Sequence, residues 1–267
     1  LYYMALKAAK KMAVTLGETE DITWYDARIN SIEKNFEKEY WQGNRYGSKK
    51  KLIEERVSAL AIISGLAKKE HYNILVDSVL VPVKKSSPHM EWMAEEAIML
   101  TGQYDKGLQR MKQRYESQVN MEWLTTLYEK YQPELRGTYN HAWNAPNYVL
   151  SRYIAGIKPT DVAWSNFEVK PNLEHLTSVK QIVPSVKGDI TLEVNKTENM
   201  YTMNLISPKE TTATLYIPKT GNVFVNEQLF WKKGKLKKQI KGIEYESESN
   251  EFLKFKVDSG NWKIVAN

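Results

Sequence analysis

Apolar residues from Leu1 to about Ile157 recur three or four positions apart, which is the spacing of one face of an α-helix. The first run ends at Gly17, and Thr19 or Asp21 is placed to cap the second run, which reaches Tyr40. The connections between runs are short and carry Gly, Pro, Ser or Asn, as between antiparallel neighbours. Further helices are predicted over residues 52–66, 72–83, 90–100, 104–115, 121–131 and 145–157.

From Pro159 onward the pattern changes to short runs rich in β-branched and aromatic residues. The residues between the runs have turn compositions at Lys187–Asp189, Lys219–Gly221 and Asp258–Asn261. Many short strands separated by such turns favour a β-sandwich. The predicted strands cover residues 181–183, 190–194, 200–205, 212–217, 222–225, 252–257 and 262–265.

Composition narrows the class of protein. The 267 residues are 42% hydrophobic and contain no cysteine, so disulfides and thiolate metal sites are excluded. No run approaches the roughly 18 apolar residues of a membrane span, and no spanning helix is expected.

The net charge of +6 is spread along the chain, no arginine follows Arg152, and the lysines of residues 232–238 are typical of a solvated turn. We therefore expect no nucleic-acid partner.

Candidate chemistry is limited to carboxylates and aromatic rings. The four histidines show no metal-ligand spacing, and neither a serine nucleophile elbow nor a glycine-rich loop after a strand occurs, so no metal or cofactor is expected. Tryptophans and glutamates gather in the helical part, and such rings stack on sugars while paired carboxylates cleave glycosidic bonds. A Trp at helical spacing more often belongs to a core, and an isolated Glu is usually solvated.

An ordered set of motifs makes the prediction more specific. The segment Thr125–Glu129 precedes Gly137–Asn144, and Leu150–Pro159 follows as a helix with a Gly-Ile-Lys-Pro exit. The order resembles glycoside hydrolase family 78, the α-L-rhamnosidases, in which Thr-Thr-x-Trp-Glu precedes an Asn-His motif, a helix and a Gly-Ile-x-Pro exit. The resemblance runs from near Leu1 to about Val194, and the sequence departs from the family at Tyr128, where Trp is usual.

The resemblance implies a two-part architecture: the second half of an (α/α)6 toroid over residues 1–158, then an antiparallel β-sandwich over 159–267. The helical pattern alone leaves a complete bundle or a solenoid equally open. The resemblance assigns the general base to Glu129, so that a water attacks with inversion and a second carboxyl lies roughly 6.5–9.5 Å away. For substrate binding it implies His141 and Asn140, and Trp143, Glu91 and Trp92 are added as candidates.

The family's general acid lies in an upstream motif with Arg and Trp, which Glu20, Asp21 and Asp26 do not match. We therefore expect the acid outside these residues, in a preceding part of the polypeptide against which the chain packs, and no glycosidase activity from this chain alone. The expected partner is a rhamnose-containing glycan or glycoside, in an extracellular or periplasmic setting. Alternatives are a related toroid acting on fucose, arabinose or uronic acid, and a non-catalytic glycan-binding protein. In the β-domain, Phe230–Trp231 is the one candidate sugar platform.

Overall fold

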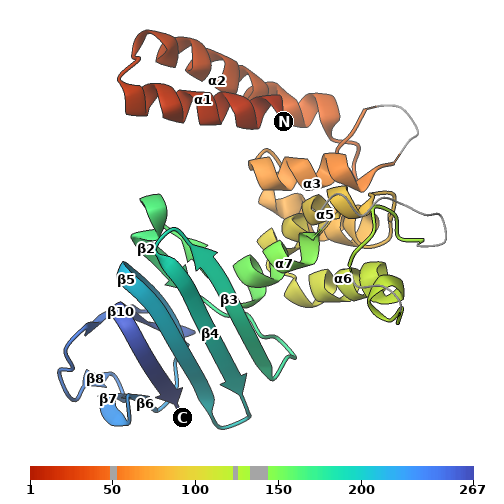
Figure 1. The fold of residues 1–267 in the computed structure, drawn as a ribbon. Coiled ribbons are helices and arrows are strands. Elements are labelled where there is room, and N and C mark those ends of the chain that lie inside the picture. Colours follow the sequence, from red (N-terminus) through yellow and green to blue (C-terminus); the bar gives the residue numbers. More distant parts are fainter. Residues whose placement is uncertain (49–52, 123–125, 133–143) are drawn as a thin grey trace. The chain divides into compact units, whose positions relative to one another are not determined.

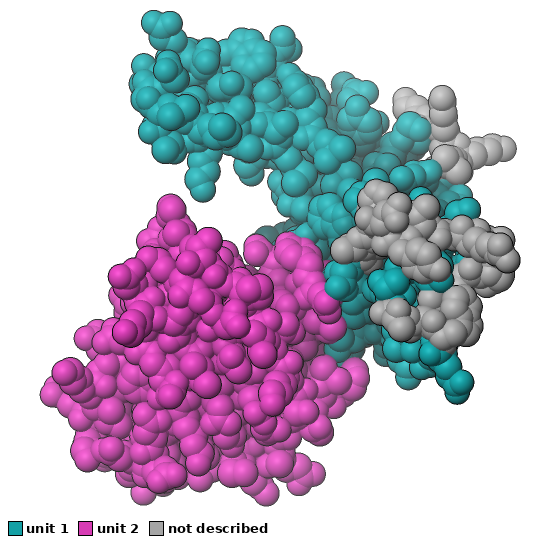
Figure 2. Space-filling view, viewed as in Figure 1, with its two compact units in different colours: residues 1–146 teal, residues 147–267 magenta. Residues whose placement is uncertain are grey.

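The structure is a computed structural model that describes residues 1–267 except 49–52, 123–125 and 133–143. It forms two compact units, residues 1–146 and 147–267 (Figure 2). The division falls before the predicted boundary at residue 158 because the end of the last helical segment is bonded to the strand-rich unit. The side-chain amide of Asn172 donates to the carbonyl of Tyr153, and its backbone N–H donates to that of Ile154.

The first unit is helical, as predicted (Figure 1). Helix α1 ends at Gly17 in the left-handed conformation with φ of 78°, and α5 begins with Pro88 in its first turn. The end at Gly17 is the one predicted from the sequence, whereas the helix predicted over 90–100 begins two residues earlier, at Pro88. The described helices are α1 (Tyr2–Leu16), α2 (Glu20–Tyr40), α3 (Glu55–Ser64), η1 (Lys69–His71), α4 (Tyr72–Leu75), the π-helical turn η2 (Val76–Leu80), α5 (Pro88–Leu100) and α6 (Tyr104–Val119).

The helix predicted over residues 121–131 is wrong. Helix α6 ends at Val119, and the described residues of that stretch form turns and bends instead. The physical reason lies in hydrogen bonding, because the N–H of Tyr128 and the carbonyls of Lys130 and Tyr131 bond to side chains of α6. Thr126 adds a β-branched residue, which weakens helix propensity further.

Apolar side chains of α3, α4, η2 and α5 form the main core of the helical unit. Ala59, Leu75, Leu80 and Ile98 have no exposed surface, and Trp92 packs against this cluster while remaining partly exposed. Because these side chains come from consecutive hairpins, their burial fixes α5 against α3. Helix α5 is the element that carries the buried carboxylates described below.

The connection into the second unit is shorter than the helix predicted over 145–157. Helix α7 (Ala145–Val149) and the π-helical turn η4 (Leu150–Ile154) end before Gly156, and strand β1 (Ile157–Pro159) begins at once. Gly156 has φ of 70°, and a Cβ at this position would lie 1.8 Å from the carbonyl oxygen of Lys170. Only glycine therefore allows the close approach between this turn and the segment after β2.

The strands of the second unit are hydrogen-bonded into one ten-stranded sheet, mostly antiparallel. The exception is the parallel pair of β2 and β5. The strands after β1 are β2 (Asn166–Val169), β3 (Ser178–Ser185), β4 (Gly188–Lys196), β5 (Tyr201–Pro218), β6 (Asn222–Val225), β7 (Gln228–Lys232), β8 (Lys235–Leu236), β9 (Ile243–Glu248) and β10 (Phe252–Ala266).

Two long strands organise this sheet. Strand β5 pairs with β4 along its first half and with β2 along its second, while β10 pairs with β9 and then with β6. Each therefore merges two of the predicted short strands. The turn predicted at Asp258–Asn261 is wrong: these residues form a bulge inside β10, where the N–H of Gly260 bonds to the hydroxyl of Ser207 at 3.2 Å.

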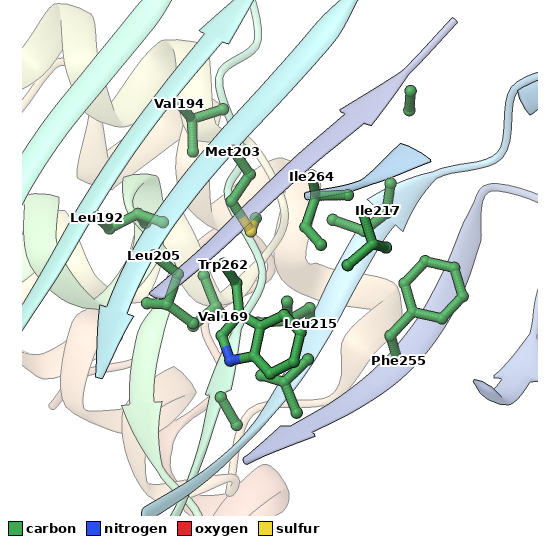
Figure 3. Close-up of a cluster of buried hydrophobic side chains, with 14 of the residues drawn as sticks. Val169, Leu192, Val194, Met203, Leu205, Leu215, Ile217, Phe255, Trp262 and Ile264 are labelled. Carbon is green, nitrogen blue, oxygen red and sulfur yellow. The ribbon is translucent and has the colours of Figure 1, made fainter. Parts of the chain in front are cut away.

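The core of the second unit lies between the inward faces of these strands. Alternate residues of β5 and β10, such as Met203, Leu205, Phe255 and Ile264, are fully buried and point into it (Figure 3). Phe230 and Trp231 of β7 are buried too, with exposed fractions of 1% and 3%. The predicted sugar platform at Phe230–Trp231 is therefore wrong. The β6–β7 register shifts at this point, and both consecutive rings face inward.

Candidate active site

The segment that carries Glu129 lies against the C-terminal end of α6. The side chain of Gln118 bonds to the backbone on both sides of Glu129: its Nε2 donates to the carbonyl of Lys130 at 2.7 Å, and its Oε1 accepts from the N–H of Tyr128 at 2.9 Å. The hydroxyl of Ser117 donates to the carbonyl of Tyr131 at 3.3 Å. Glu129 itself is half-buried. Its backbone is thus fixed by the helix that precedes it.

The ring of Tyr131 attaches the segment that carries Glu129 to α6 at a second point. The guanidinium carbon of Arg114 lies 3.7 Å from the centre of that ring, and the ring of Tyr115 meets it edge-on at 5.4 Å between centres. Burial, and then the charge of Glu91, raise the pKa of the Tyr131 hydroxyl, which therefore stays neutral. Stacking of a guanidinium on an aromatic face is strongest where water is excluded, so this contact holds the segment on α6.

Behind this segment lies a buried ion cluster, consisting of Glu55, Glu91, Glu95, Arg110 and Arg114. Arg110 donates from Nε to one oxygen of Glu91 at 2.5 Å and from Nη2 to the other at 3.0 Å, while Nη2 also reaches Glu55 at 3.4 Å. Arg114 donates from Nε to Glu91 at 3.3 Å. Glu55, Glu91 and the side chain of Arg110 have no exposed surface.

Backbone groups complete the cluster. Arg110 also donates from Nη1 to the carbonyls of Leu80 and Val83, and Glu55 accepts from the N–H of Ser86 at 2.7 Å. Burial raises the pKa of Glu55, but the bonds from Ser86 and the charge of Arg110 outweigh it, and the net pKa is lowered. The bidentate pair with Glu91 likewise outweighs burial at Arg110 and raises its pKa. Glu55 and Arg110 are thus ionised at neutral pH.

The sequence carries a signal for this cluster that the motifs of the sequence analysis do not include. Glu91 and Glu95 are four residues apart on α5, and Arg110 and Arg114 are four residues apart on α6. Residues four apart lie on one face of a helix, so two such pairs of opposite sign on neighbouring helices predict facing charges. Glu55 at the start of α3 has no comparable signal.

Glu95 differs from the other members. It is fully buried, and among the described residues neither carboxylate oxygen has a hydrogen-bond partner. Burial, and then the charge of Glu91, raise its pKa well above the usual range. The two arginines already balance Glu55 and Glu91, so ionised Glu95 would add an uncompensated charge. Burial and the missing hydrogen-bond partners thus favour the neutral form of Glu95 in the folded protein.

Replacing Glu95 by methionine is expected to stabilise the protein by about 1–3 kcal/mol at pH 8, because it removes an unsatisfied buried acid of similar volume. The folded pKa is raised, so the wild-type protein loses stability as pH rises from the unfolded value of about 4.3 toward the folded one. The advantage of the variant should therefore grow with pH. Urea unfolding at pH 4.5 and pH 8 measures it, and a variant less stable at both would contradict the assignment.

The structure brings some of the predicted site residues together. Glu91 and Trp92 lie on α5, and Arg114 joins Glu91 to the segment of Glu129 through Tyr131. Both oxygens of Glu91 are occupied by arginines, which fits a structural role better than direct contact with a substrate. Trp92 packs partly on the apolar core. The predicted substrate-binding residues Asn140, His141 and Trp143 lie outside the described residues.

Neither a metal-binding cluster nor a membrane-spanning helix occurs in the described part of the chain. Within those residues, no group of three or more His, Asp or Glu side chains is arranged to bind a metal ion. In the same residues, no helix combines the length and apolarity needed to cross a bilayer.

Helical hairpins followed by a mostly antiparallel β-unit define the class of six-hairpin glycosidases with a C-terminal β-domain. The family model of the bacterial α-L-rhamnosidase six-hairpin glycosidase domain matches residues 1–144, and that of the bacterial α-L-rhamnosidase C-terminal domain matches residues 156–229. The chain belongs to the bacterial α-L-rhamnosidase family. A search of curated protein sequences finds no match to the chain.

Three solved structures that are similar to this chain are of α-L-rhamnosidases. The enzyme of Dictyoglumus thermophilum matches with a TM-score of 0.77 and 16% sequence identity. The match covers 100% of this chain and 31% of the Dictyoglumus thermophilum chain. The Streptomyces avermitilis enzyme, solved with L-rhamnose, has a TM-score of 0.71 and 17% sequence identity, and the match covers 100% of this chain and 26% of that enzyme's chain. The Aspergillus terreus enzyme has a TM-score of 0.73 and 14% sequence identity, and the match covers 99% of this chain and 29% of that enzyme's chain. The chain thus spans less than a third of the length of these relatives.

Proposed function

We propose that this chain supplies the general base of an inverting α-L-rhamnosidase and that Glu129 is that base. The observation that carries the proposal is the placement of Glu129: it ends the family's Thr-Thr-x-aromatic-Glu motif and is half-buried in a segment pinned to α6. A half-buried carboxylate keeps access to water while its direction is controlled, and a general base needs both.

In the proposed reaction, Glu129 accepts a proton from a water molecule as the water attacks the anomeric carbon. A carboxylic acid outside these 267 residues donates a proton to the leaving oxygen. Inversion follows because the water attacks the face of the sugar opposite the leaving group. The coverage of less than a third of each solved relative supports the placement of the acid elsewhere in the polypeptide.

The test is a panel of 4-nitrophenyl glycosides offered to the complete polypeptide that contains this chain. We expect release of nitrophenol from the α-L-rhamnoside and little from the α-L-fucoside, α-L-arabinoside or β-D-glucuronide. Preference for another sugar would replace rhamnose as the substrate. Tight rhamnoside binding without turnover would make the protein a glycan binder. Turnover by the 267-residue chain alone would contradict the placement of the acid outside it.

A further inference from the structure

The side chain of Gln118 makes an unusual pair of contacts. One amide group bonds to the backbone of the residue before Glu129 and of the residue after it, at 2.9 Å and 2.7 Å. Gln118 lies in the last turn of α6 and is 2% exposed, so water does not compete for either bond. A glutamine amide has both a donor and an acceptor, and this arrangement uses both at once.

These two bonds replace the hydrogen bonding that a helix would have provided. The described residues 126–132 after α6 form bends without regular secondary structure. A loop without such bonding samples many backbone conformations unless side chains fix it. Because Tyr128 and Lys130 flank Glu129 directly, fixing both restricts the direction in which the Glu129 side chain leaves the backbone.

We propose that Gln118 is a positioning residue that sets the orientation of the Glu129 carboxylate for proton abstraction. This inference rests on the proposed function, since it concerns the same base. Gln118 touches the loop backbone and acts on the reaction only through Glu129. The Arg114–Tyr131 stack and the Ser117 bond to Tyr131 hold the next residues, so the pinning extends from residue 128 to 131.

The anchor of this arrangement is rigid. Helix α6 is attached to α5 and α3 through Arg110, whose side chain has no exposed surface and makes bonds to Glu91 and Glu55. Arg114, one turn further along α6, contacts both Glu91 and the ring of Tyr131. The buried ion cluster thus supports the helix end from which Gln118 reaches the loop. A base held on such a support loses little orientation during turnover.

The experiment compares three variants of the complete polypeptide in the hydrolysis of 4-nitrophenyl α-L-rhamnoside. Gln118→Met keeps the volume of the side chain and removes both hydrogen bonds. We expect its kcat to fall about 10- to 100-fold with KM changed less than about threefold, because the base is misdirected while the sugar pocket is intact. Gln113→Met is the matched control on the exposed face of α6, where we expect no change.

Gln118→Glu keeps the oxygen that accepts from Tyr128, and once the new carboxyl ionises it loses the donor to Lys130 and places a negative charge near the base. Like charges raise the pKa of a carboxyl, so the acid limb of the kcat–pH profile should move up by about half a pH unit. Hydrogen exchange of peptides within residues 126–132 is measured on the same proteins. Exchange should be faster in Gln118→Met than in the wild-type protein and unchanged in Gln113→Met.

The outcomes separate this inference from the proposed function. A wild-type protein that does not cleave the rhamnoside, or a Glu129→Gln variant that retains activity, overturns the proposed function and this inference with it. If the wild-type protein is active, unchanged exchange in Gln118→Met shows that the bonds do not pin the loop. Faster exchange with unchanged kcat and pH profile shows that Gln118 is merely structural. Either result overturns the positioning role alone.

Discussion

Replacing Arg110 by methionine is expected to destabilise the helical unit by about 3–5 kcal/mol, because the change leaves buried carboxylates without their main partner. Glu91 would keep only its 3.3 Å bond from Arg114, and Glu55 would keep the N–H of Ser86. The carbonyls of Leu80 and Val83 would lose a donor as well. A loss of this size is comparable with the whole stability of many domains. Urea unfolding followed by circular dichroism at 222 nm measures it.

The destabilisation by Arg110→Met should shrink as pH falls. Wild-type Glu55 has a lowered pKa, so it stabilises the fold at neutral pH and loses this contribution as pH falls through that value. In the variant, the orphaned carboxylates take up protons more readily, and the variant regains stability in acid. The difference between the two proteins should therefore be largest near pH 7 and smallest near pH 4.

Two companion variants test whether the stranded buried charges cause the destabilisation by Arg110→Met. Lys106→Met, on the same helix, removes a solvent-exposed pair with Asp77 and should cost less than about 1 kcal/mol. Adding Glu91→Met to Arg110→Met removes the stranded charge and should recover a large part of the loss. If Arg110→Met costs no more than Lys106→Met, the buried ion cluster does not hold the helices as described.

Replacing Glu129 by glutamine is expected to lower kcat of the complete polypeptide on an aryl α-L-rhamnoside by about 10²- to 10⁴-fold. Glutamine has the same shape but cannot accept a proton from water at neutral pH, while it can still occupy the same position. KM should therefore change little, because the interaction lost is one made in the transition state.

A second glutamate of the same segment provides the control. Glu122 is exposed and precedes Glu129 by seven residues, and Glu122→Gln should keep kcat within about twofold. Circular dichroism should show the same helix content in both variants. A Glu129→Gln variant within tenfold of the wild-type kcat, or an equal loss in Glu122→Gln, would contradict the assignment of the base.

The sequence was most informative where local rules decide the structure. Gly17 ends α1 with a positive φ, as the sequence predicted. The runs over 190–194, 200–205 and 212–217 predicted strands, and the structure has them within β4 and β5, where alternate residues are buried. These features depend on neighbours within a few positions, and a single sequence contains them.

Features that depend on distant residues were not predictable in the same way. The helix predicted over 121–131 fails because Gln118 takes the backbone bonds at Tyr128 and Lys130, a choice that helical periodicity does not reveal. Residues 258–261 have the composition of a turn, but β10 continues through them with a bulge at Gly260. The strand continues because β5 pairs with β10 both before and after the bulge. Phe230 and Trp231 are buried by a register shift that only the partner strand defines.

The candidate site was predicted only in part. Glu129 came from the resemblance of its motif to a family and not from its own surroundings, and its role stays a prediction. The buried ion cluster could have been inferred from the i, i+4 pairs on α5 and α6. The neutral state of Glu95 could not, since it depends on burial and on the charge balance of residues from three helices.

The most direct test of the proposed base is rescue of a Glu129→Ala variant of the complete polypeptide by azide. The variant lacks the group that deprotonates water, but azide attacks an anomeric carbon without needing a base, and the shortened side chain leaves room for it. With 2,4-dinitrophenyl α-L-rhamnoside, we expect almost no turnover in buffer, recovery with azide, and β-L-rhamnosyl azide by proton NMR. Turnover near wild type without azide, no recovery with it, or an α-configured product would contradict the role of Glu129 as the base.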